Sequence, residues 1–140
     1  MGKRCFVIMP FSETSAKHTE AYWTNFFTGF IKPQVEKLGY TCIRSQAQPS
    51  NIISDVLSEL CTADLVLAVL TDHNANVWYE LGIRHVLSKG TIMIMEKSQH
   101  LPFDISHYGT LTYEDSITAA LDFEERLKGF VNRIENSQPV

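Results

Sequence analysis

A short block near the middle of the sequence carries the residues best suited to chemistry. Residues 74–82 read Asn-Ala-Asn-Val-Trp-Tyr-Glu-Leu-Gly. Asn76 can cap a helix, because its side-chain oxygen accepts from the free N–H groups of the first turn, and Glu80 then falls about one turn inside that helix. A carboxylate placed there can act as a nucleophile or accept a hydrogen bond from a sugar hydroxyl.

The orientation of Glu80 separates two interpretations. At about 100° per residue, a helical wheel places Glu80 beside Leu87, on the stripe that should face the sheet. A buried charge is costly unless something compensates, and the helix N-terminus could keep this carboxylate ionised. Alternatively, Glu80 turns outward and only complements the helix dipole. The expected apolar stripe comprises Tyr79, Ile83, Val86 and Leu87.

Two other side chains could contact a bound ligand. Arg44 ends a predicted strand and could pair its planar guanidinium with a phosphate, although a solvent-facing ion pair would explain it equally well. His73 could donate to a leaving base or to a phosphate, or it could simply be an exposed loop residue. Three further histidines have no metal-ligand spacing and are joined by no cysteine, so we expect no metal. They are His18, His100 and His107.

The elements that must position these residues follow from the hydrophobic pattern, in which short β-branched runs alternate with longer amphipathic stretches. The first predicted helix should kink or divide into two helices at Pro33, and it should end at Gly39. Right-handed crossovers then favour an α/β fold with a doubly wound parallel five-stranded sheet in the order 2-1-3-4-5. Strands are predicted over residues 4–9, 40–44, 65–70, 91–95 and 110–113, and helices over residues 20–38, 51–61, 77–88 and 115–134.

The loops after the first three strands should form the ligand site, because ligands bind beyond the carboxyl ends of the strands in such sheets. These loops span residues 10–17, 45–51 and 71–76. The turn after the first strand contains neither a Gly-x-Gly-x-x-Gly nor a phosphate-loop pattern. Hydride transfer and nucleoside triphosphate hydrolysis are therefore disfavoured, and we expect no cofactor.

Four segments, in the right order, resemble landmarks of the nucleoside 2-deoxyribosyltransferase-like and TIR-like superfamily. The resemblance covers residues 4–113 and implies a flavodoxin-like (Rossmann-like) sheet. In active members a glutamate on the helix after the third strand cleaves an N-glycosidic bond, and Glu80 matches that position. The four segments are residues 5–11, 63–68, 74–85 and 101–105. The resemblance also implies a wall around the sugar or base made by Met9, Pro10, Phe11 and Ser12, and a contact with the ribose from Asn74 or Asn76.

Two positions depart from the family pattern. Many relatives have an acidic residue late in the third strand, where this chain has Val69, and another after the second-strand arginine, where it has Gln46. Asp72, three residues beyond Val69, could substitute as a hydrogen-bonding carboxylate in the catalytic site.

These features predict a hydrolase or transferase that cleaves the N-glycosidic bond of a nucleoside, nucleotide or NAD-like substrate through Glu80. Glu80 and the complete block over residues 74–82 favour this enzyme. The alternative is a non-catalytic module of the same fold that senses a nucleotide or signals by self-association. Val69 and Gln46 favour that alternative.

Composition sets the class of protein and its expected surroundings. The chain has 140 residues and a net charge of −4, so we expect one globular domain that binds no nucleic-acid polymer. No apolar run is long enough to span a bilayer, and the N-terminus lacks the features of a signal peptide, which indicates a cytoplasmic protein without a membrane partner. Residues 1–136 should form the domain and residues 137–140 a loose tail.

Two further expectations concern thiols and assembly. Three widely spaced cysteines, each beside hydrophobic residues, indicate reduced thiols in the core. They are Cys5, Cys42 and Cys61. The aromatic stretch over residues 22–30 offers more apolar surface than one side of a small sheet can cover, which predicts a homodimer or a higher homo-oligomer.

Overall fold

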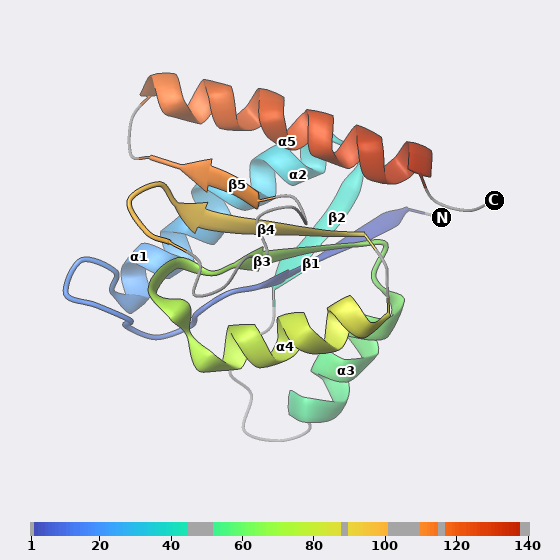
Figure 1. The fold of residues 1–140 in the computed structure, drawn as a ribbon, viewed down its shortest axis with the longest axis horizontal. Helices are drawn as coiled ribbons and strands as arrows, with labels where there is room; N and C mark the ends of the chain where they lie inside the picture. Colours follow the sequence, from blue (N-terminus) through green and yellow to red (C-terminus); the bar gives the residue numbers. More distant parts are fainter. Residues whose placement is uncertain (1, 45–51, 88–89, 101–109, 115–116, 138–140) are drawn as a thin grey trace.

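The sheet has the predicted topology. The computed structural model describes residues 2–44, 52–87, 90–100, 110–114 and 117–137. Five parallel strands lie in the order β2-β1-β3-β4-β5, a flavodoxin-like arrangement with helices on both faces (Figure 1). The strands are β1 (Lys3–Ile8), β2 (Tyr40–Arg44), β3 (Leu65–Val69), β4 (Thr91–Glu96) and β5 (Thr110–Tyr113). The helical elements are α1 (Glu20–Asn25), the π-helical η1 (Phe26–Ile31), α2 (Lys32–Lys37), α3 (Ile52–Thr62), the 3-10 turn η2 (Thr71–His73), α4 (Ala75–Val86) and α5 (Ile117–Ser137).

The sheet separates two apolar cores. One lies between the sheet and the helical elements α1, η1, α2 and α5, and the other between the sheet and α3 and α4 (Figure 1). Side chains of β1 alternate between them, with Cys5 and Val7 in the first core and Phe6 and Ile8 in the second, because successive strand residues point to opposite faces. The central strand β3 is buried at all of its positions, as expected where both faces are covered.

Predicted strand boundaries agree with the structure to within one residue, whereas the helix boundaries differ more. Helix α4 begins and ends two residues earlier than predicted. Helix α5 continues to Ser137, the first residue of the predicted tail. The remaining tail residues, 138–140, lie outside the described residues, as does the predicted site loop over residues 45–51.

The predicted kink near Pro33 is a π-helical segment. Proline lacks an N–H group, and its ring clashes with the carbonyl four residues before it, so an α-helix cannot continue unchanged through this position. Just before the proline, the Lys32 N–H donates to the Phe27 carbonyl, five residues back. The chain resumes as α2 with Pro33 in its first turn. Gly39 then turns the chain toward β2 with a φ of +95°, a conformation that glycine adopts without a Cβ clash.

The aromatic stretch is packed inside the molecule. Trp23 is fully buried, Phe26 lies against Tyr113 of β5 with ring centroids 4.8 Å apart, and Phe30 lies 4.9 Å from Phe123 of α5. In Figure 1, α1, η1 and α2 lie on the same face of the sheet as α5. The prediction of a homo-oligomer assumed that this stretch leaves an apolar patch uncovered. Phe26 and Phe30 instead contact rings of β5 and α5, and the oligomeric state stays a prediction.

Two of the three cysteines occupy the core. Cys5 and Cys42 are buried, and they pair opposite each other in the register of β1 and β2. The prediction for Cys61 was wrong, because this thiol is exposed near the end of α3. None of the helices in the described part of the chain combines the length and the hydropathy that crossing a bilayer requires.

Candidate functional site

A cavity of about 450 Å³ opens at the carboxyl ends of β1 and β3. Its walls come from the loop after β1, from α3, and from α4 with the residue that caps it. In doubly wound sheets, ligands bind at this edge. The chain connections from β1 and β3 run to opposite sides of the sheet there, which leaves a crevice between the two strand ends. The lining residues are Met9, Pro10, Phe11, Ser12, Val56, Leu57, Asn74, Asn76, Tyr79, Glu80 and Ile83.

Most of the lining residues are those that the sequence assigned to the site. The loop residues Met9, Pro10, Phe11 and Ser12 face Asn74, Asn76 and Glu80 across the same cavity. Sequence reasoning missed four apolar members, which are Val56, Leu57, Tyr79 and Ile83. A signal for them existed, because a helix that follows a parallel strand begins at the carboxyl edge of the sheet, so the first turns of α3 and α4 had to border the site.

A turn of unusual backbone conformation leads into α4. Asp72 and His73 have φ values of +66° and +52°, in the left-handed region that non-glycine residues rarely occupy. Asn74 then caps α4, and its side-chain oxygen accepts from the N–H groups of Asn76 at 3.0 Å and Val77 at 3.2 Å. The prediction that Asn76 is the cap was therefore wrong by two residues, and Asn76 lies instead within the first turn.

Helix α4 is rotated relative to the predicted wheel. Its buried residues are Val77, Leu81 and Arg84, whereas Tyr79 is 72% exposed and Val86 is 82% exposed. The cause is Arg84, whose guanidinium donates to the carbonyl oxygens of three residues at 2.8 to 3.0 Å. These are Leu60, Ala63 and Gly90. With an arginine in a core-facing position, Tyr79, Val86 and Leu87 of the predicted apolar stripe are exposed, whereas Ile83 is partly buried.

This rotation puts Glu80 in the wall of the cavity rather than against the sheet. Its side chain is half-buried, and burial raises the pKa of Glu80 to about 7. Within the described residues, no hydrogen bond or ion pair engages the Glu80 carboxylate. A carboxyl group that is partly removed from water without a partner is costly, and such groups gather at functional sites.

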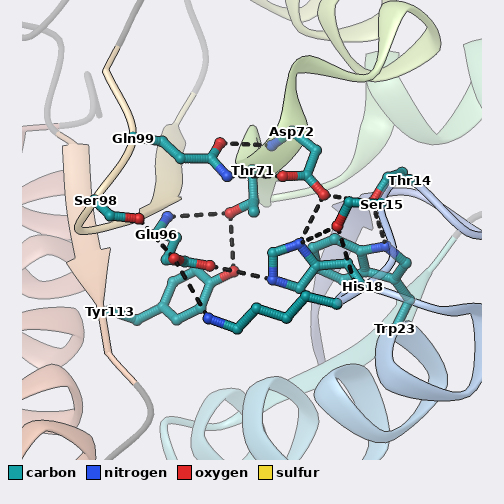
Figure 2. Close-up of polar contacts among 11 residues, drawn as sticks. Thr14, Ser15, His18, Trp23, Thr71, Asp72, Glu96, Ser98, Gln99 and Tyr113 are labelled. Atoms are coloured by element: carbon teal, nitrogen blue, oxygen red, sulfur yellow. Dashed lines mark hydrogen bonds and ion pairs between the residues drawn. The ribbon is translucent and has the colours of Figure 1, made fainter.

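Asp72, the second carboxylate considered for catalysis, lies outside this lining and inside a polar network (Figure 2). Its Oδ2 accepts from the Thr14 hydroxyl at 2.7 Å and lies 2.7 Å from His18 Nδ1, and its Oδ1 accepts from the Gln99 amide at 2.7 Å. Desolvation raises the pKa of Asp72, but the hydrogen bonds from Thr14, Gln99 and His18 outweigh it and lower the pKa to about 2. Asp72 is therefore a firmly ionised and fully engaged carboxylate.

The network continues through residues that sequence reasoning did not connect. His18 Nε2 lies 3.1 Å from Oε2 of Glu96 at the end of β4, and the Glu96 N–H donates to the Thr71 hydroxyl at 3.0 Å. Thr71 in turn is hydrogen-bonded to the Tyr113 hydroxyl at 2.8 Å (Figure 2). The carboxyl ends of β3, β4 and β5 meet at one edge, and this would have indicated that Thr71, Glu96 and Tyr113 lie together.

The remaining candidates, Arg44 and His73, do not line the cavity, although Arg44 Nη1 lies 4.0 Å from the sulfur of the lining residue Met9. Arg44 donates to the Trp23 carbonyl at 3.4 Å and to the Thr24 hydroxyl at 3.3 Å. Burial lowers the pKa of Arg44. His73 is exposed, and its ring lies parallel to that of Trp78 with centroids 6.0 Å apart. Neither Arg44 nor His73 is among the described residues that line the cavity.

The positions that depart from the family pattern fall elsewhere. Val69 is completely buried at the end of β3, and Gln46 lies outside the described residues. Within the described ranges, no three histidine, cysteine or carboxylate side chains are grouped so that they could hold a metal ion. No protein-family model matches this chain, and a search of curated proteins finds no match either. The site is therefore interpreted from its own chemistry.

Proposed function

We propose that this chain is a hydrolase or transferase that cleaves the N-glycosidic bond of a nucleoside, nucleotide or NAD-like substrate, with Glu80 as nucleophile. The observation that carries the proposal is the Glu80 carboxylate, half-buried and without a partner among the described residues, in the wall of a largely apolar cavity. The resemblance of residues 4–113 to nucleoside 2-deoxyribosyltransferase-like and TIR-like proteins supports the same chemistry.

The reaction begins when a carboxylate oxygen of Glu80 attacks the anomeric carbon of the sugar. The bond from that carbon to the base breaks, its electron pair leaves with the base, and the base takes up a proton. Positive charge develops on the sugar in the transition state, and a carboxylate in a partly desolvated wall stabilises this charge more strongly than water does. Water, or a second base, then attacks the same carbon and releases Glu80, which completes hydrolysis or transfer.

Other lining residues have chemistry that suits this substrate. The rings of Phe11 and Tyr79 and the side chain of Ile83 offer apolar surface for a base. Ser12, Asn74 and Asn76 offer hydrogen-bonding groups for sugar hydroxyls. The capping bonds engage only the side-chain oxygen of Asn74, so its amide N–H groups remain to donate.

One observation favours the second candidate, a non-catalytic module that senses a nucleotide or signals by self-association. Retaining glycosidases use two carboxyl groups about 5 Å apart, one as nucleophile and one as acid. Among the described lining residues Glu80 is the single carboxylate, and Asp72 is engaged in the neighbouring network. Catalysis by Glu80 therefore requires that the departing base take its proton from solvent or from a group other than a carboxylate.

A direct assay separates the two candidates. Purified protein is incubated with ribonucleosides, 2′-deoxynucleosides, their 5′-monophosphates and NAD, and release of free base is followed by chromatography. Turnover should fall by at least about 10²-fold in Glu80→Gln, because the variant keeps the size of the side chain and removes the charge that faces the developing cation. Glu36→Gln, an exposed position on α2, is the matched control and should keep full turnover. Full turnover in Glu80→Gln, or no base release from any substrate, would contradict the proposal.

A further inference from the structure

The charge of the cavity narrows the choice of substrate. We infer, building on the proposed function, that the site takes a nucleoside without a phosphate and discriminates against nucleotides and dinucleotides. The decisive juxtaposition is that of a free carboxylate, Glu80, with cavity walls that contain no lysine or arginine among the described residues.

The cationic side chains on the elements around the cavity contact other protein groups. Arg44 is held over the Phe27 ring at 5.3 Å and donates to α1, and Lys17 faces Glu96 at 3.9 Å. Arg84 is fully buried and donates to three backbone carbonyls near the amino ends of β3 and β4. None of these three groups lines the cavity. Arg44 Nη1 lies 4.0 Å from the sulfur of the lining residue Met9, behind the wall, and its guanidinium is held there by its bonds to α1.

The segments outside the described residues add almost no positive charge. Residues 45–51, which follow β2, read Ser-Gln-Ala-Gln-Pro-Ser-Asn and contain no lysine or arginine. Residues 101–109 contain none either. Lys89 is the single lysine or arginine in all of the undescribed segments.

The N-terminus of α4 does not replace a cation. Helix N-termini bind phosphate when their free N–H groups point at the anion. In α4 the side chain of Asn74 already accepts from the N–H groups of Asn76 and Val77. A phosphate at this helix would therefore have to displace the cap, at the cost of the capping bonds.

Phosphate binding in this cavity is unfavourable for two reasons. A phosphate that leaves water needs charge-assisted hydrogen bonds to offset its desolvation, and the walls supply no guanidinium or ammonium group. The nearby Glu80 carboxylate carries the same sign of charge and would repel the phosphate whenever both are ionised. An uncharged nucleoside avoids both costs and still gains the apolar contacts of Phe11, Tyr79 and Ile83.

Matched pairs of ligands test the inference. Binding of adenosine, 2′-deoxyadenosine, cytidine and nicotinamide riboside is measured by calorimetry against AMP, dAMP, CMP and NAD, and base release is measured in parallel. The nucleoside of each pair should bind at least about tenfold more tightly than its phosphorylated partner, or about 1.4 kcal/mol. Equal or tighter binding of the phosphorylated partners, or no binding by any nucleoside, would overturn the inference. If nucleosides bind more tightly than their phosphorylated partners but no base is released, the inference on ligand choice is supported and only the proposed catalysis is contradicted.

A second test of the inference adds a positive charge to the cavity wall. Tyr79→Arg introduces a guanidinium at a lining position and should tighten binding of the monophosphates at least about tenfold, which narrows the preference for the nucleoside. Val86→Arg adds the same charge to the same helix at an exposed position outside the lining and should leave each ratio unchanged. The inference would be contradicted if Tyr79→Arg left the ratio of nucleoside affinity to monophosphate affinity unchanged. It would also be contradicted if Val86→Arg changed this ratio as much as Tyr79→Arg does.

Discussion

The Nδ1 atom of His18 lies 2.7 Å from Oδ2 of Asp72, while the Nε2 atom of the same ring lies 3.1 Å from Oε2 of Glu96. A single buried imidazole thus joins the loop after β1 to the turn after β3 and to the end of β4 (Figure 2). Because the joined loops also carry Phe11 and Asn74, this contact holds two walls of the cavity together.

Asp72→Asn should destabilise the fold through this network. Asparagine keeps the volume of the side chain but replaces one accepting oxygen with a donating NH2 group. That group would face donors from which Asp72 now accepts hydrogen bonds, so part of the network is left unsatisfied. We expect a loss of about 1 to 3 kcal/mol in the free energy of unfolding, measured by urea denaturation. Asp122→Asn, at an exposed position on α5, is the matched control and should change it by less than about 0.5 kcal/mol. Equal effects of the two substitutions would refute a stabilising role for the network.

The lowered pKa of Asp72 predicts acid sensitivity. Because its pKa is about 2 in the folded protein, below the ordinary value of 3.8, its contribution to stability is complete above about pH 4 and is lost as the pH falls toward 2. The difference in unfolding free energy between wild type and Asp72→Asn should therefore shrink across this range, by on the order of 2 kcal/mol. Denaturation curves at pH 5, 4, 3 and 2 measure this difference, and a constant difference would contradict the lowered pKa of Asp72.

The contribution of Glu80 to stability should have the opposite pH dependence to that of Asp72. Its pKa is raised from 4.5 to about 7 in the folded protein, so its contribution to stability is present at low pH and is lost as the pH rises from about 4.5 to 7. Glu80→Gln should match wild type near pH 4 and be more stable near pH 8, by about 1 kcal/mol after allowance for solvent screening of a partly exposed group. Thermal melts at the two pH values provide the measurement. A variant that is less stable than wild type at pH 8 would mean that the carboxylate has a favourable partner.

The same pKa predicts the pH dependence of base release. A nucleophilic Glu80 must be ionised, so kcat/KM should rise about tenfold per pH unit below 7 and level off above it. The profile is measured with one nucleoside over pH 5 to 9. A rate that instead falls above pH 7 would identify Glu80 as a proton donor and rule out its role as nucleophile.

Arg84→Met tests the residue that sets the rotation of α4. Methionine fills a similar volume but leaves the carbonyls of Leu60, Ala63 and Gly90 without their buried donor. We expect a loss of about 2 to 4 kcal/mol in unfolding free energy. Arg133→Met, at an exposed position on α5, is the matched control. A loss below 1 kcal/mol for Arg84→Met would show that the helix orientation does not depend on these bonds.

Strand positions and sheet order were predictable because β-branched runs and crossover handedness depend on local sequence and on chirality. The rotation of α4 was not predictable in the same way, because the prediction located the core face of this helix from its apolar residues alone. Arg84 occupies that face through bonds to the carbonyls of Leu60 and Ala63, more than 20 residues earlier in the chain, and of Gly90 just before β4. The helix start was also misplaced, since Asn74 and Asn76 are chemically equal as caps and only the conformation of the preceding turn selects Asn74.

The loop and helix positions of the candidate site were predictable from topology, because the first and third strands end side by side. The role of Asp72 was not predictable from topology. Its position after β3 was compatible with the cavity, but its side chain lies among Thr14, His18 and Gln99 instead. The position of the Asp72 side chain depends on hydrogen-bond partners from two other loops, those after β1 and β4, and no spacing within the sequence encodes it.

The π-helical segment leaves a signature in the spacing of the buried residues. Trp23, Phe27, Ile31 and Val35 are all buried and follow one another at intervals of four. In a continuous α-helix each interval of four overshoots a full turn by about 40°, so the last of these residues would sit about 120° away from the first. The wider π turn absorbs this drift and keeps the four side chains on one face. A strict period of four over three intervals, followed closely by a proline, can therefore point to such a turn in other sequences before any coordinates exist.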